Sequence, residues 1–233
     1  MTAGQTARER ARAELTGAIK DEARRQLAVD GAHQLSLRAV ARALGMASSA
    51  IYRYFPSRDE LLTALIIDAY DALGEAVEAV EPVAEPALWW HAVCTAVRNW
   101  ALANRHEYAL IFGSPVPGYR APHDTVAPAA RIPLALVRVA EAADLPDGEL
   151  PAELRAQVEH LLGMTGSTLT PGAMARVMIT WTQLFGMIGF ELFGQLVGSA
   201  DPAEAFFDHT VREMAAFLGL RSPNVAHAIG SQP

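Results

Sequence analysis

Apolar residues in this chain recur at steps of three and four, and proline and glycine break the repeat into short runs. This period is typical of amphipathic helices, whereas a strand would alternate at every second residue. No alternation of useful length follows residue 80, and the chain contains no internal repeat. With 233 residues and 51% hydrophobic content, the chain can bury a sizeable core. We therefore predict an all-α protein of one large or two modest domains.

The first sixty residues predict three helices. Apolar positions at helical spacing indicate one helix over residues 14–29, which Gly31 ends. Ser36 is expected as the N-cap of a short second helix, and Gly45 as the residue that ends it. A third helix is expected over residues 47–54. Two short helices joined by a glycine-containing turn form a helix-turn-helix (HTH) pattern.

The third predicted helix has two different faces. The positions at helical spacing are apolar or aromatic and are expected to pack inward: Ala47, Ala50, Ile51 and Tyr54. The opposite face carries groups that can all hydrogen-bond: Ser48, Ser49, Tyr52 and Arg53. The small serines permit close approach to a duplex, while longer side chains reach phosphates or base edges, which suits a major-groove recognition helix. The alternative is an ordinary solvated helix face.

A capping box begins the next helix, with Ser57 as N-cap and Glu60 three residues later. That helix is expected over about residues 57–80, with a broad apolar stripe. Arg58 lies in its first turn, beside backbone N–H groups that have no helical partner. A guanidinium and free N–H groups together predict a phosphate-binding site.

The run from Leu44 to Leu61 closely resembles the DNA-binding signature of the tetracycline-repressor (TetR) family of transcriptional regulators. The resemblance covers about residues 14–70 and includes the glycine-containing turn, the aliphatic-Tyr-x-Tyr-Phe ending and the Pro-Ser-basic-acidic-Glu-Leu junction. It implies a homodimer that places two recognition helices in successive major grooves of a palindromic operator. It also implies a ligand that binds the C-terminal domain and changes their separation. Family members often have Ser or Thr at the position of Ala47 and Lys at that of Arg58.

The formal charge of −7 conceals two opposed parts. Residues 1–60 have a net charge of +3 and residues 61–233 one of −10. We predict a helix-turn-helix DNA-binding domain over residues 1–60, ordered from about residue 14. A larger helical ligand-binding and dimerisation domain is predicted over residues 61–221, followed by a flexible tail over residues 222–233.

The predicted DNA contacts fall into two groups. The groove contacts are Ser48, Ser49, Tyr52 and Arg53, and the phosphate contacts are Ser36, Arg38 and Arg58. The N-terminal arginines are either a minor-groove arm or a solvated, disordered tail: Arg8, Arg10 and Arg12.

Helical runs continue to the end of the second domain. They cover about residues 86–104, 105–113, 125–144, 151–165, 171–197 and 203–219, with a Pro/Gly-rich loop over 113–123. The last two are predicted to form a four-helix dimer interface, where Gly186 and Gly189 permit close approach. Residues 178–196 have about the length of a membrane span, but Glu191 makes insertion costly, so we predict no membrane association.

Large apolar side chains outline a ligand pocket in the second domain. The predicted ligand-binding residues are Trp89, Trp100, Tyr108, Phe112, Met178, Trp181 and Phe185. They suit a small apolar or aromatic effector of unknown identity. The alternative is that these side chains simply fill the core.

No catalytic pattern appears, so we predict no enzyme activity and no cofactor. His91 and Cys94 share a helix face, but without further ligands a buried cysteine and a hydrogen-bonded histidine are favoured over a metal site. Glu191 either binds a cationic ligand or is solvated or paired with an arginine. The N-terminus lacks a signal-peptide pattern, which predicts a cytoplasmic protein. The predicted function is a repressor, with an activator or a DNA binder without effector as the alternative.

Overall fold

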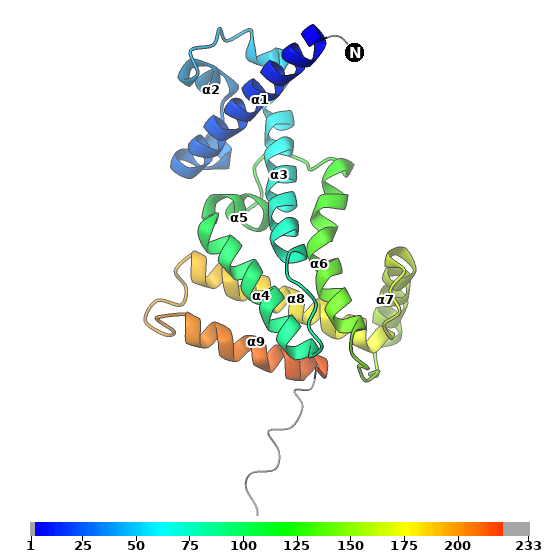
Figure 1. The fold of residues 1–233 in the computed structure, drawn as a ribbon. Coiled ribbons are helices and arrows are strands. Elements are labelled where there is room, and N and C mark those ends of the chain that lie inside the picture. Colours follow the sequence, from blue (N-terminus) through cyan, green and yellow to red (C-terminus); the bar gives the residue numbers. More distant parts are fainter. Residues whose placement is uncertain (1–2, 221–233) are drawn as a thin grey trace, which may run out of the picture. The chain divides into compact units, whose positions relative to one another are not determined.

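The computed structural model describes residues 3–220, with side chains from Thr6 onward, and all regular elements in this range are helical (Figure 1). The tail predicted over residues 222–233 lies outside the described residues. The described chain divides into two compact units. The first contains the residues up to Asp71 together with Asn104–Ala129, and the second contains Ala72–Ala103 together with the residues from Ala130 on.

The first unit is built around three α-helices and the start of a fourth. It contains α1 (Ala3–Asp30), η1 (Ala32–Gln34), α2 (Leu37–Ala43), η2 (Ile51–Arg53), the first part of α3 (Arg58–Glu78), α5 (Arg105–Phe112) and η3 (His123–Thr125). Its core consists mainly of aliphatic side chains from α1, α2, η2 and the start of α3, among them Ile19, Val40, Ile51, Leu61 and Leu65.

The helix starts predicted at Ser36 and Ser57 are confirmed, and Thr170 caps a helix in the same way. The Ser36 Oγ accepts a hydrogen bond from the Ala39 N–H at 3.4 Å, and the Ser57 Oγ accepts one from the Glu60 N–H at 3.1 Å. In the second unit, the Thr170 Oγ1 accepts one from the Ala173 N–H at 3.2 Å. Each hydroxyl thereby satisfies one of the N–H groups that a helix start leaves without a partner.

The first helix is longer than predicted. We expected order from about residue 14, but α1 begins at Ala3. The added residues are mostly Ala, Arg and Glu, which are good helix formers. Extending a helix that already exists adds one hydrogen bond per residue without a new nucleation cost, so the apolar stripe from Leu15 on does not mark where the helix begins.

The prediction of a third helix over residues 47–54 is wrong about the kind of structure that forms there. Residues 48–50 form a turn, and only Ile51–Arg53 form a short 3₁₀ helix, η2. The bonds Ala50 N–H to Ala47 O and Tyr54 N–H to Ile51 O span three residues, at 2.8 and 2.9 Å. Serine hydroxyls compete for backbone groups and lower helix propensity, so this segment winds more tightly than an α-helix.

The first unit extends beyond the boundary predicted at residue 60. The start of α3 supplies Leu61, Leu62 and Leu65 to its core. From further along the chain, Leu110 and Ile111 of α5 pack against the same core. Burying these side chains is favourable in proportion to the apolar area removed from water. The apolar contacts therefore group residues 61–71 and 104–129 with the N-terminal helices.

The second unit is organised around α8. It contains the end of α3, α4 (Pro86–Ala103), most of α6 (Val126–Glu141), α7 (Ala152–Thr165), α8 (Pro171–Leu192) and α9 (Glu204–Leu218). Helix α8 packs against α4, α7 and α9, and α4 also packs against α9. The Trp90 Nε1–H on α4 donates to the Val211 carbonyl on α9 at 3.2 Å.

Helix α8 is shorter than the predicted span of 171–197. It ends at Leu192 because Gly194 adopts the left-handed conformation, with φ of 80°. The Gln195 N–H then donates to the Phe190 carbonyl at 2.9 Å and the Gly194 N–H to the Glu191 carbonyl at 3.3 Å. These bonds satisfy carbonyls that the helix end leaves free.

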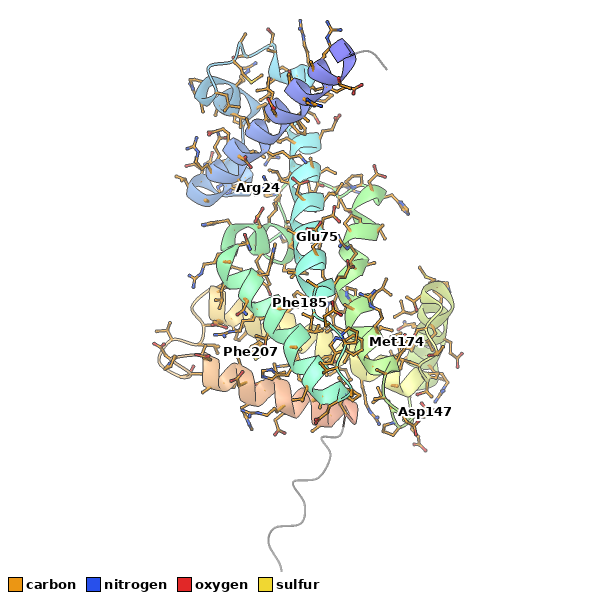
Figure 2. All side chains as sticks on the ribbon, viewed as in Figure 1. Arg24, Glu75, Asp147, Met174, Phe185 and Phe207 are labelled. Atoms are coloured by element: carbon orange, nitrogen blue, oxygen red, sulfur yellow. The ribbon has the colours of Figure 1, made fainter. Side chains whose placement is uncertain are left out.

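The alternatives for Glu191 are resolved in favour of an arginine pair. Its two carboxylate oxygens accept hydrogen bonds from Arg98 Nε and Nη2 at 2.8 and 2.6 Å. Both side chains are largely buried, at 13% exposed. The Arg98 guanidinium also lies 4.9 Å from the ring centre of Phe207, which is labelled in Figure 2. The pair joins α4 to α8 and raises the pKa of Arg98, chiefly through the hydrogen bond to Glu191.

Asp147 joins the loop before α7 to the start of α8 (Figure 2). One carboxylate oxygen accepts hydrogen bonds from the backbone N–H groups of Gly148 and Gly172, both at 2.9 Å. A side chain at Gly172 would bring its Cβ within 2.2 Å of the Gly148 nitrogen, so this close approach requires glycine. The two backbone hydrogen bonds lower the pKa of Asp147.

We expect the Asp147→Asn substitution to remove a pH-dependent part of the stability. The folded-state pKa of Asp147 lies below its unfolded value of about 3.9. The carboxylate therefore adds to the free energy of unfolding above that pH, and this contribution is lost as the pH falls through the folded-state value. Urea unfolding of both proteins between pH 7 and pH 3 should show a stability difference that shrinks with acid. A difference that is the same at every pH would contradict this role.

Candidate nucleic-acid interface

The polar face predicted for the third helix is exposed in the structure. All four of its residues are exposed: Ser48, Ser49, Tyr52 and Arg53. Ile51 lies on the opposite side and is fully buried, while Ala50 and Tyr54 are half-buried. Ala47 was expected to pack inward but is exposed, because the segment around it is a turn and not the helix that would have rotated it toward the core.

The tight winding brings exposed side chains into line. In a 3₁₀ helix, side chains three residues apart eclipse each other. Ser49 and Tyr52 are three residues apart, and both are exposed. We name residues 47–54 the recognition segment; it presents two hydroxyl groups, a phenol and a guanidinium on one short surface.

Arg12 on α1 contacts the backbone and an aromatic ring of the recognition segment. Its Nη2–H donates to the Arg53 carbonyl at 3.2 Å, and its guanidinium lies 5.3 Å from the ring centre of Tyr54. A cation at the carbonyl end of a helical turn is electrostatically favourable. Arg12, together with the exposed Arg8 and Arg10, lies within α1, so these three residues do not form the disordered tail that we considered as the alternative. A minor-groove contact by them stays a prediction.

The side chains predicted to contact phosphates differ in exposure and in the hydrogen bonds that they already make. Arg38 is exposed in the first turn of α2, next to the N-cap Ser36. Ser36 is half-buried, and its hydroxyl already accepts the capping hydrogen bond. Its backbone N–H is one of the groups that a helix start leaves without a helical partner.

Arg58 mainly binds backbone carbonyls. Its Nη2–H donates to Ala32 at 2.8 Å and to His33 at 3.4 Å, and its Nε–H donates to Leu35 at 3.1 Å. These bonds join the start of α3 to the segment that precedes α2. The side chain remains 30% exposed, and a phosphate contact by Arg58 stays a prediction.

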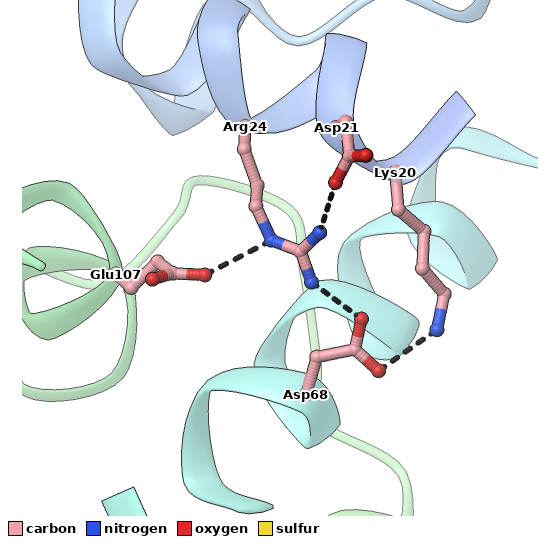
Figure 3. Close-up of polar contacts among 5 residues, drawn as sticks. All are labelled: Lys20, Asp21, Arg24, Asp68 and Glu107. Atoms are coloured by element: carbon pink, nitrogen blue, oxygen red, sulfur yellow. Dashed lines mark hydrogen bonds and ion pairs between the residues drawn. The ribbon is translucent and has the colours of Figure 1, made fainter. Parts of the chain in front are cut away.

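The sequence did not predict a cluster of ion pairs that joins α1, α3 and α5 (Figure 3). Its members are Lys20, Asp21, Arg24, Asp68 and Glu107. The pairing of Asp21 with Arg24, three residues apart on one helix, follows from helical spacing. The contacts of Arg24 with Asp68 and Glu107 span 44 and 83 residues, so no local pattern indicates them.

The seven predicted ligand-binding residues do not all belong to one unit. Trp89, Trp100, Met178, Trp181 and Phe185 lie in the second unit. The rings of Trp181 and Phe185 meet edge to face at 6.5 Å between centres. Trp100 is 8% exposed and so contributes to the core of that unit.

Tyr108 and Phe112 lie in the first unit, on α5. The Phe112 ring lies 5.1 Å from that of Tyr108 and 5.9 Å from that of Tyr70 on α3. The Tyr70 hydroxyl donates to the Ile111 carbonyl at 3.4 Å, and burial raises the pKa of Tyr108 well above its usual range. These two residues therefore pack as an aromatic cluster between α3 and α5, which their sequence positions alone did not indicate.

Two neighbouring tryptophans on α4 differ in their polar contacts. The Trp90 Nε1–H is bonded to a carbonyl, but the Trp89 Nε1 is buried with no hydrogen-bond partner in the described structure. Most buried donors in folded proteins have a partner, so an unpaired buried N–H requires an explanation. Trp89 thus remains the predicted ligand-binding residue with an unused hydrogen-bond donor.

A cleft that we did not predict lies between α4 and α9. It has a volume of about 740 Å³, and its lining includes Leu88, His91, Val211, Arg212 and Ala216. None of the seven predicted ligand-binding residues lines it. The cleft therefore gives no support to the predicted pocket.

His91 and Cys94 differ in burial and in their contacts. Cys94 is fully buried, and burial raises the pKa of its thiol. The His91 Nε2 lies 3.3 Å from Asp208 Oδ1, and its Nδ1 lies 3.5 Å from Thr95 Oγ1. In the range that the structure describes, no three His, Cys, Asp or Glu side chains gather closely enough to bind a metal ion. Within the same range, no helix has both the length and the apolar character needed to cross a bilayer.

Two family models match this chain. Residues 19–65 match the model described as bacterial regulatory proteins, tetR family, and residues 90–214 match the tetracyclin repressor-like C-terminal domain. The first match includes the recognition segment, and the second begins in α4 and ends in α9.

Curated relatives and solved structures agree with these models. The HTH-type transcriptional regulators Rv1816 of Mycobacterium tuberculosis and Mb1846 of Mycobacterium bovis are each 37% identical over 223 residues, which is 91% of this chain and 95% of theirs. The crystal structure of the regulatory protein SCO4313 has a TM-score of 0.77 at 34% identity and covers 89% of this chain and 98% of its own. The regulator PfmR from Thermus thermophilus, at 18% identity and a TM-score of 0.54, shares the fold; the match covers 88% of this chain and 98% of that one.

Proposed function

The chain belongs to the TetR family of transcriptional regulators, and we propose that it is a repressor that binds a palindromic operator as a homodimer and is released by a small apolar or aromatic effector. This family consists of DNA-binding regulators and not of enzymes. The observation that carries the proposal is the exposed polar face of the recognition segment, which is backed by the buried Ile51.

The chemistry of that face supports major-groove binding. Ser48 and Ser49 are small enough to let the backbone approach the duplex, and both offer hydroxyl groups. Arg53 can donate two hydrogen bonds to a guanine edge or to a phosphate, and Tyr52 can reach the backbone. Two such segments, related by a dimer axis, would contact half-sites about 34–36 Å apart.

We expect Arg53→Ala and Tyr52→Ala to weaken operator binding. Loss of a specific base contact costs about 1–3 kcal/mol, and loss of a phosphate contact lowers the salt slope by about one. Fluorescence anisotropy with palindromes from the DNA that flanks the gene, repeated at several salt concentrations, would measure both effects. Arg138→Ala is the control, because it removes an exposed arginine from α6 in the second unit. If neither substitution changes the affinity, the assignment of the recognition segment is wrong.

Exposed apolar side chains on α8 and α9 support the proposed dimer interface. On α8, Ile179 and Phe190 are 53% and 56% exposed, and on α9, Phe206 and Phe217 are 40% and 48% exposed. Gly186 lies on the same face of α8 as Phe190, four residues earlier, and a Cβ there would meet open space. A glycine inside a helix costs about 1 kcal/mol relative to alanine. Close approach of a second helix would account for that cost.

We expect Phe190→Glu to convert the dimer to a monomer, since it would place a carboxylate at the centre of an apolar interface. Size-exclusion chromatography with light scattering would measure the mass, and operator affinity should fall because a monomer contacts one half-site. Leu88→Glu on α4 is the control, because Leu88 is 58% exposed but lies outside the proposed interface. A Phe190→Glu protein that remains a dimer would contradict this interface.

The unpaired Trp89 Nε1 supports an effector with a hydrogen-bond acceptor, such as a phenol, ketone or alcohol. Such a ligand would satisfy the buried donor while its apolar body contacts apolar side chains of the second unit. The effector would favour a dimer whose recognition segments no longer match the half-site spacing.

We expect compounds that carry such an oxygen to raise the melting temperature and release the operator, and their oxygen-free analogues to do neither. Trp89→Phe should weaken the active compounds by about tenfold, since a lost hydrogen bond costs about 1 kcal/mol or somewhat more. Trp90→Phe is the control, because the Trp90 Nε1–H already donates to the Val211 carbonyl. Removing this bond should lower the stability of the protein without changing its preference for compounds that carry an oxygen. If no compound both stabilises the protein and releases DNA, the effector part of the proposal fails while operator binding stands.

A further inference from the structure

Arg24 uses its whole guanidinium to join three helices of the first unit (Figure 3). From α1, its Nε–H donates to Glu107 on α5 at 3.0 Å, and its Nη2–H donates to Asp68 on α3 at 2.7 Å. Its Nη1–H donates to Asp21 on α1 at 2.8 Å. Lysine has no planar fork of donors, so it cannot reproduce these three directions at once.

The ion pairs that join α1 to α3 and to α5 differ in the number of cations that form them. Asp68 has a second cation, Lys20, whose Nζ lies 2.8 Å from its other oxygen. Glu107 forms no other ion pair among the described residues. The link between α1 and α3 is therefore double, whereas the charged link between α1 and α5 depends on Arg24 and Glu107 alone.

The environment makes these pairs stronger than ordinary surface pairs. The side chains of Arg24, Asp68 and Glu107 are 32%, 26% and 20% exposed. Partial shielding from solvent reduces screening, and charge-assisted hydrogen bonds at 2.7–3.0 Å are the strong kind. Removing one partner would leave a carboxylate partly buried and unpaired, which is unfavourable.

Helix α1 connects this cluster to the recognition segment. Arg12, in the N-terminal half of α1, contacts the Arg53 carbonyl and the Tyr54 ring. Arg24 lies on the same helix, about 18 Å further along at 1.5 Å per residue. Helix α5 in turn follows α4 of the second unit directly, through Asn104. The covalent connection through Asn104 thus meets α1 at the Arg24–Glu107 pair, while α3, which belongs to both units, meets α1 at Asp68.

We infer that Arg24 is a positioning residue: its pair with Glu107 sets the position of α1, and thereby of the recognition segment, relative to α5. In the dimer this position determines which half-site spacing the protein accepts. The inference rests on the proposed function, since it requires a dimer on a palindromic operator.

The test compares operators that differ only in the distance between their half-sites. Affinity is measured for the natural palindrome, for palindromes with one or two base pairs added or removed, and for a single half-site. The full-length wild-type protein should prefer one spacing. Glu107→Gln and Arg24→Met should each reduce that preference by about fivefold or more, while binding to the single half-site stays unchanged.

Two control variants separate positioning from a general loss of charge. Lys20→Met removes a cation from the same cluster but leaves the Arg24–Glu107 pair intact. Arg25→Ala removes the neighbouring arginine, which is 71% exposed and pairs with Glu22 on α1. Both should keep the wild-type spacing preference. Should Arg24→Met fail to fold, as judged by its melting temperature, Glu107→Gln alone decides, because it keeps the shape of the side chain.

The outcomes distinguish failure of the inference from failure of the proposed function. If the wild-type protein prefers one spacing and Glu107→Gln retains that preference, the inference is wrong. It is also wrong if Lys20→Met loses the preference to the same extent, or if half-site binding falls in parallel with the palindrome. If the wild-type protein binds no palindrome better than a single half-site, the proposed function fails first.

Discussion

The burial of Ile51 is the constraint on which the DNA-binding part of this protein depends. A 3₁₀ helix of three residues has too few hydrogen bonds to hold itself, so tertiary contacts must do so. Ile51 lies fully buried among side chains of α1, α2 and α3, and Phe55 is buried close behind it. With that side fixed in the core, the opposite side must face solvent. The polar groups of the recognition segment are thus exposed to solvent because the Ile51 side chain is buried.

Charged groups in both halves of α1 complement this apolar core. Arg12 contacts the recognition segment, and Arg24 contacts α3 and α5. In the second unit, the Arg98–Glu191 pair joins α4 and α8 in a similar way, and both side chains are largely buried. These arginines suit such sites because a planar guanidinium can satisfy several acceptors at once and stays charged when partly buried. Both units therefore combine an aliphatic core with a few directional ion pairs between helices.

The sequence predicted the features that depend on neighbours a few residues away. Ser36 and Ser57 cap their helices as expected, and Gly45 adopts the left-handed conformation expected of a helix-ending glycine. The predictions failed where they relied on the spacing of apolar residues alone. The segment 47–54 became a turn and a 3₁₀ helix, and α1 extended toward the N-terminus because its arginine-rich start favours helix. Tyr108 and Phe112 were expected with the other aromatic residues but pack with Tyr70, since apolar contacts group α5 with the first unit.

By itself the sequence determined the helical class, the helix caps, the family and the outward face of the recognition segment. Each of these follows from residue type and from spacing over one or two helical turns. Only the tertiary structure decided that Arg12 contacts Arg53, that Arg24 binds Glu107, that Arg58 binds carbonyls before α2 and that Glu191 is paired with Arg98. These partners lie 41, 83, 23 and 93 residues apart. Packing of the helices against one another brings them together, and a periodic pattern within one helix contains no information about that packing.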